Sequence, residues 1–165
     1  MDISPDEYAY FVDRAIDGMT AIVGELGDRL ACERPDLPGA NSPYVILHHC
    51  LAVLDYWGGH VVAGREVRRD RDAEFRASGP VAALIAAAAA AKRQFAEDLA
   101  TAQPAAPPRR PPLASTWQGP AQTQGHALLH LLQELAQHHG QAELTRDMLL
   151  AARQARYQSD RTGRP

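Results

Sequence analysis

The sequence predicts an all-α protein that folds as a single four-helix bundle over residues 1–165. Three observations predict this class. Four segments have either the three- and four-residue apolar spacing of a buried helix face or an alanine content that favours helix. Serine, proline and glycine residues stand where helices start and end. The 165 residues are enough for one domain to bury a core without disulfides.

The first two helices have clear starts. We expect the first helix over about residues 5–31, because Ser4 and Glu7 form a capping box with Pro5 at the first helical position. We expect the second over about residues 43–63. It follows a serine and a proline, is apolar nearly all round as a buried helix is, and stops near a glycine.

The last two helices are joined to the rest by long connections. An alanine-rich helix is expected over about residues 80–102, and a fourth helix over about 123–157 with a frayed tail after it. The charged connection 64–79 is expected to be solvated and ion-paired, and the proline-rich connection 104–113 to be extended. Both can cross the length of the bundle, so a simple up-and-down order is not required.

Composition excludes several classes of function. The chain has 17 basic and 20 acidic residues and a net charge of −3, which argues against a nucleic-acid partner. It lacks an apolar run of about 20 residues, so no membrane span is expected. The N-terminus has no apolar signal-peptide core, and two cysteines make no disulfide framework. We therefore expect a cytoplasmic protein.

Histidines and one glutamate are the residues that suggest chemistry. In the fourth helix, Glu134 and His138 are one turn apart and can converge on one metal ion. The second helix offers His48 and His49, of which His49 has the better case because it shares a helix face with Tyr56. Imidazole and carboxylate ligands suit zinc most of all, or nickel or another divalent first-row metal, and three ligands leave a position open for catalysis. The alternative is an ordinary solvated His/Glu pair.

Two segments resemble a known family. The run His130-Leu-Leu-Gln-Glu134-Leu-Ala-Gln-His138-His-Gly140-Gln141 resembles the last-helix signature of the DinB/YfiT-like superfamily. The match points in particular to actinobacterial branches, namely the N-terminal domain of mycothiol-dependent maleylpyruvate isomerase and the mycothiol S-transferases. The run His48-His49-Cys-Leu-Ala-Val-Leu-Asp-Tyr-Trp57 resembles the helix with the first ligand, which stands eight residues before an aromatic. That spacing selects His49.

The resemblance implies a fold, a site and partners. It implies a DinB-like bundle with up-down-down-up helix order, a metal triad of His49, Glu134 and His138, and a homodimer. It also implies a low-molecular-weight thiol, mycothiol or a similar one, as cosubstrate. The chain departs from the family at Gln141, where a histidine is common, and at Leu54, where an acid is common.

The function expected from these residues is a metal-dependent thiol transferase or thiol-dependent isomerase. A metal-bound thiolate would attack a small electrophile, so no protein cysteine is required. Tyr56, Trp57, His130 and Gln141 are the candidate cosubstrate-binding residues, with His130 also a candidate acid or base; for Tyr56 and Trp57 core packing is an equal alternative. The alternative function is a non-catalytic metal-binding, stress-response or ligand-binding module.

Overall fold

The computed structural model describes residues 3–113 and 123–162, and all regular structure among them is helical. Four long elements form the bundle: α1 (Pro5–Ala31), α2 (Pro43–Leu54), α4 (Val81–Ala100) and α5 (Gln124–Thr162). A π-helix, η1 (Asp55–Ala63), continues α2, and a four-residue helix, α3 (Arg71–Glu74), interrupts the crossover between η1 and α4. The predicted all-α bundle is confirmed.

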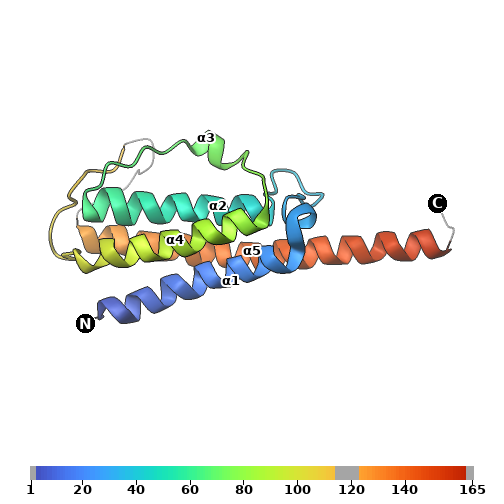
Figure 1. The fold of residues 1–165 in the computed structure, drawn as a ribbon, viewed down its shortest axis with the longest axis horizontal. Helices are drawn as coiled ribbons and strands as arrows, with labels where there is room; N and C mark the ends of the chain where they lie inside the picture. Colours follow the sequence, from blue (N-terminus) through green and yellow to red (C-terminus); the bar gives the residue numbers. More distant parts are fainter. Residues whose placement is uncertain (1–2, 114–122, 163–165) are drawn as a thin grey trace.

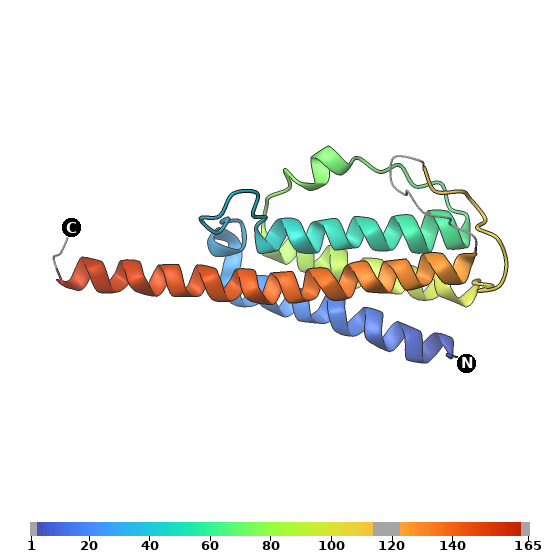
Figure 2. The ribbon, with the colours of Figure 1, turned by 180° about the vertical axis from the view of Figure 1, so that it is seen from behind.

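The helices run in an up-down-down-up order. In Figure 1, α1 and α5 run in one direction, whereas α2 and α4 both run in the opposite one. Two consecutive parallel helices require a connection that returns along the whole bundle. The crossover with α3 provides it and lies along one side of α2 (Figures 1 and 2).

Both predicted helix starts have the caps that the sequence indicates. The Ser4 hydroxyl accepts a hydrogen bond from the Glu7 amide, and the Glu7 carboxylate accepts one from the Ser4 amide. At the second helix, the Ser42 hydroxyl accepts from the amide of Val45. These caps satisfy amide groups that have no partner inside the helix, which fixes where α1 and α2 begin.

The second helix changes its winding just after the candidate ligand His49. From Asp55 the backbone adopts π-helical winding, which continues to Ala63 and ends at Gly64 with a left-handed φ of 80°. A glycine tolerates this φ without the steric cost that a side chain adds. Tyr56 and Trp57 lie in this π-helical stretch and, with relative exposures of 0% and 2%, belong to the core.

The core lies where α1, α2, η1, α4 and α5 meet. Its largest fully buried side chains come from four of these elements, α1, α2, η1 and α5, and include Ile16, Met19, Ile46, Leu47, Tyr56, Trp57, Leu131 and Leu135. In the part of the chain that the structure describes, every helix is too short or too polar to cross a bilayer.

The fifth helix is longer than the sequence predicts. It continues to Thr162, where an end near residue 157 is expected. Its last part, residues 151–161, is exposed and projects beyond the bundle (Figure 2). Neither glycine nor proline occurs between Gly140 and this end, so the helix continues with little support from the rest of the fold, among it an ion pair of Arg156 with Glu33 at 3.6 Å. Residues 163–165, the rest of the expected tail, lie outside the described residues.

Gly18 allows α1 and α5 to approach each other closely, whereas Gly140 takes no part in such a contact. A Cβ atom built on Gly18 would lie 2.1 Å from Nε2 of His139, whereas one built on Gly140 would have nothing within 4 Å. Close helix packing therefore does not require a glycine at position 140. The side chain of His139 leaves α5 towards α1 and packs against Gly18. It therefore points away from the side chain of its neighbour His138.

Candidate metal centre

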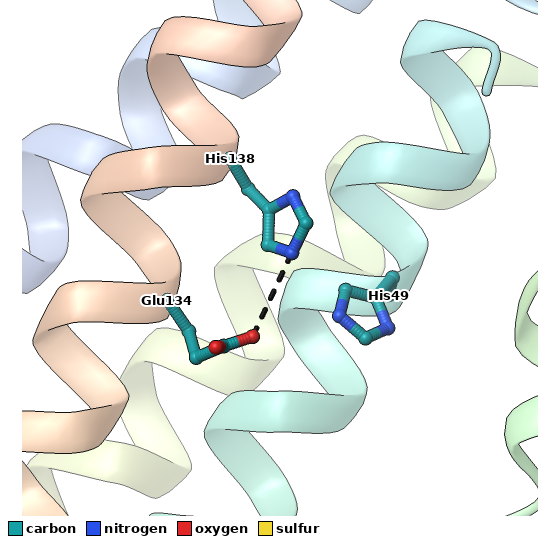
Figure 3. Close-up of side chains that lie close together, drawn as sticks. All are labelled: His49, Glu134 and His138. Carbon is teal, nitrogen blue, oxygen red and sulfur yellow. Dashed lines mark ion pairs between the residues drawn. The ribbon is translucent and has the colours of Figure 1, made fainter. Parts of the chain in front are cut away.

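His49, Glu134 and His138 come together between α2 and α5. One ligand atom from each residue lies within 4.8 Å of the other two. The rings of His49 and His138 are 4.8 Å apart at an angle of 81°. Figure 3 shows the three side chains converging from two helices, Glu134 one turn before His138. Among the described residues this is the only group of three or more histidine, cysteine or acidic side chains close enough to share an ion.

Antiparallel packing of the two helices explains the convergence. Glu134 and His138 are four residues apart, so both side chains leave α5 on the same face. That face packs against α2, whose residue His49 points into the interface and is 3% exposed. The predicted pattern thus brings its three residues to one place.

His138 is held by its own helix. Its Nδ1 lies 2.8 Å from the amide oxygen Oε1 of Gln141, and its Nε2 lies 3.7 Å from Oε2 of Glu134. Since the amide oxygen is an acceptor, the Nδ1 atom of His138 donates, and Nε2 faces the cluster. Pairing with Glu134 raises the pKa of His138, although burial opposes this, and the same pairing lowers the pKa of Glu134.

His49 is held instead by the crossover. Its Nδ1 lies 2.8 Å from Oε2 of Glu74, which ends α3, and Phe75 stacks on its ring with centroids 5.0 Å apart. Arg69 donates to both carboxylate oxygens of Glu74, at 2.7 Å from Nε and 3.0 Å from Nη2. Burial lowers the pKa of His49 more than the hydrogen bond to Glu74 raises it.

Burial of this charged pair contradicts the expectation of a solvated crossover. The side chains of Arg69 and Glu74 are only 4% and 5% exposed. Burial opposes ionisation of Glu74, but the hydrogen bonds from Arg69 and His49 outweigh it and lower the pKa of the carboxyl. Nothing in the sequence separates these two residues from the other alternating charges of the connection, so sequence analysis missed them.

The cluster is buried on one side and accessible on the other. The His49 side chain is 4% exposed, whereas those of His138 and Glu134 are 25% and 28% exposed. A small molecule can therefore approach from the α5 side. The donor set of two imidazole nitrogens and one carboxylate oxygen matches the preferences of zinc and its first-row neighbours.

The other candidate residues lie around the cluster in different ways. Tyr56 and Trp57 are core side chains; the guanidinium of Arg69 stands 5.7 Å above the Tyr56 ring, and the ring of His130 meets that of Trp57 edge-on at 4.6 Å. Gln141, as described above, holds His138. Burial lowers the pKa of His130, so this imidazole favours its neutral form.

The remaining histidines and the nearest cysteine take no part in the cluster. The ring of His60 stacks on Tyr56 with centroids 5.2 Å apart. Cys50 is fully buried, and burial raises the pKa of its thiol far above the ordinary value. A thiol in this state is a poor nucleophile, so Cys50 serves the packing of the core.

Fold and site together define a helical bundle with a candidate metal centre between its second and last helices. A family model described as mycothiol-S-transferase matches residues 8–150. The match spans most of the chain and includes all three clustered residues, so the chain belongs to this family, as the sequence resemblance indicates. A search of curated proteins found no match.

Proposed function

We propose that the chain is a metal-dependent S-transferase that joins a low-molecular-weight thiol of the mycothiol type to a small electrophile. The observation that carries the proposal is the cluster of His49, Glu134 and His138, whose ligand atoms lie within 4.8 Å of one another in a chain of the mycothiol-S-transferase family. We propose zinc as the ion, in keeping with the donor set.

The chemistry that a metal would supply here is the lowering of a thiol pKa, so that the thiolate is available at neutral pH. Structural zinc sites use four protein ligands, whereas catalytic sites use three and keep one position open. Three protein ligands here would therefore leave one position for the thiol. The partial exposure of Glu134 and His138 supports entry of the thiol from their side.

His130 is our candidate for accepting the thiol proton. It stands one turn before Glu134 on α5, and its lowered pKa keeps an imidazole nitrogen free to accept. The thiol sulfur would then form a bond to an electrophilic carbon, and the displaced group would leave with its electron pair. Gln141 orients His138 through its amide oxygen. Trp57 packs edge-on against His130, and Tyr56 packs in turn against Trp57.

The experiment is a conjugation assay on the full chain. Purified mycothiol and monochlorobimane are mixed with the zinc-loaded protein, with the chelated protein and with Glu134→Gln. We expect fluorescent conjugate to form above the uncatalysed rate only with the loaded wild type. Equal rates in all three samples would contradict the transferase, and zinc binding without turnover towards any of several electrophiles would support a non-catalytic binding module instead.

The size and identity of the thiol need a second arm. Cysteine and glutathione replace mycothiol at the same concentration in the assay of the wild-type protein. The rate with each thiol is compared with the rate with mycothiol. A clear preference for mycothiol supports the cosubstrate proposed here. A preference for cysteine or glutathione would assign a different thiol to the same site.

A further inference from the structure

The crossover contains a buried charged pair that the proposed chemistry does not use. Arg69 and Glu74 are 4% and 5% exposed, and removing both charges from water is costly even when they are paired. The short helix α3 delivers Glu74 to this position from an otherwise irregular connection. Because such a pair adds little stability by itself, its contact with His49 is the feature to explain.

The distances decide which nitrogen of His49 carries the proton. Oε2 of Glu74 lies 2.8 Å from Nδ1, whereas Nη2 of Arg69 lies 3.4 Å from the same atom. An ionised carboxylate only accepts hydrogen bonds and a guanidinium only donates. The shorter contact therefore prevails, and Nδ1 carries the hydrogen. The lone pair of His49 is then on Nε2, at the opposite edge of the ring.

We propose that Glu74, neutralised by Arg69, is a positioning residue that fixes His49 in the tautomer and orientation needed to bind the metal ion. The inference rests on the proposed metal site. Histidine ligands generally donate their second ring nitrogen to a carboxylate or carbonyl, which orients the ring and makes it a better ligand. Phe75, next to Glu74 in the chain, stacks on the ring and limits its rotation. Metal affinity thus depends on how the crossover packs against α2.

The test is the zinc affinity of Glu74→Gln in the full chain, measured by competition with a chromophoric chelator. An amide has one acceptor oxygen, so it cannot accept from Nε of Arg69 at the Oε1 position and also from His49 at the Oε2 position, as the carboxylate does. We expect the affinity to fall by about 10–100-fold. Glu66→Gln is the matched control, because it makes the same charge change on the same crossover at a side chain that is 67% exposed; its affinity should equal that of the wild type.

A second measurement separates positioning from a general structural role. Nitrogen-15 NMR of the metal-free wild type at neutral pH reports which ring nitrogen of His49 is protonated. We expect the hydrogen on Nδ1 in the wild type and in Glu66→Gln, and a shift towards the Nε2–H form in Glu74→Gln. If Glu74→Gln does not fold, the tautomer of the wild type still decides the question.

Two results would overturn the inference while leaving the proposed function intact. One is a wild type that binds zinc but carries the His49 hydrogen on Nε2 in its metal-free form. The other is a folded Glu74→Gln that binds zinc as tightly as Glu66→Gln. Failure of the wild type to bind zinc at all is a different result, because it overturns the metal site on which the proposed function depends.

Discussion

The two histidines of the cluster are supported in opposite ways. His138 is about a quarter exposed, and a neutral amide three residues further along its own helix accepts its Nδ1–H. His49 is almost completely buried, and an ionised carboxylate from the crossover, 25 residues away in the chain, accepts its Nδ1–H. The hydrogen bond of His138 is local, and water could replace its partner. The hydrogen bond of His49 joins residues distant in sequence and is buried away from water.

This difference has a physical consequence for each histidine. In a buried environment an unsatisfied polar partner cannot turn to water, so loss of a hydrogen bond costs more there than at an exposed site. The long-range support should therefore matter more for affinity and stability than the local one. The following changes test that ranking, from the largest expected effect to the smallest.

Removing either histidine should have the largest effect. His49→Ala and His138→Ala should both lose zinc binding by more than the 10–100-fold typical of an outer partner. His49→Ala should also lower the free energy of unfolding by about 1–3 kcal/mol, because it leaves the Glu74 carboxylate buried with one donor fewer. Metal analysis and thermal unfolding of the metal-free proteins measure both effects. His139→Ala, which changes the neighbouring histidine outside the cluster, should keep its zinc.

Lowering the pH should weaken metal binding through His138 before it affects His49. Pairing with Glu134 raises the pKa of His138, whereas burial lowers that of His49. A metal ion needs the neutral imidazole, so affinity should fall as pH decreases through the raised pKa of His138, by about tenfold for each pH unit below it. Chelator competition between about pH 5.5 and 8 measures this.

The titration order gives the check on that prediction. Ring-proton NMR of the metal-free protein should show His138 gaining its proton at a higher pH than His49 does. For stability the two shifts have opposite signs. The contribution of His138 is present below its unfolded pKa and is lost as pH rises through the folded one, whereas that of His49 is lost as pH falls below its unfolded pKa. Protonation of His49 first would contradict the account.

Replacing Gln141 by leucine should have a smaller effect on zinc affinity than Glu74→Gln. Water can reach the partly exposed His138 and take the place of the amide oxygen, so the loss should stay below the roughly tenfold lower limit for a well-buried partner. The same chelator competition applies to both variants. An affinity loss for Gln141→Leu that exceeds that of Glu74→Gln would reverse the ranking of the two supports.

Gly140→Ala should have the smallest effect. A Cβ at this position meets nothing within 4 Å, so alanine should stabilise α5 by up to about 1 kcal/mol, or about 2–4 °C in Tm for a chain of this size. Zinc affinity should not change. A destabilised variant or one with weaker zinc binding would show that the backbone after His138 needs glycine, contrary to the packing described here.

The sequence predicts those parts of this molecule that depend on local patterns. Capping at Ser4 and Ser42, the four helices and the shared face of Glu134 and His138 all follow from neighbouring residues. The pairing of Glu74 with His49 does not, because it depends on where the crossover between η1 and α4, residues 64–80, folds back. Its buried arginine and glutamate have the same sequence context as their exposed neighbours.

Glycine was the other limit of sequence reasoning. Gly18 and Gly140 both lie inside helices, and only tertiary packing distinguishes them: His139 lies against Gly18, while Gly140 faces open space. The length of α5 is a similar case. With no glycine or proline after Gly140 until residue 163, the helix continues past the bundle although no core stabilises its last turns.

X-ray absorption spectroscopy of the zinc-loaded protein tests the central claim most directly. If His49, Glu134 and His138 hold the ion, the spectrum must contain the scattering of two imidazole rings, with nitrogen and oxygen ligands at about 2.0–2.2 Å and no protein sulfur. Glu134→Gln should change the oxygen shell and leave both imidazoles. A sulfur shell at about 2.3 Å in the absence of added thiol, or a spectrum without imidazole, would contradict the site.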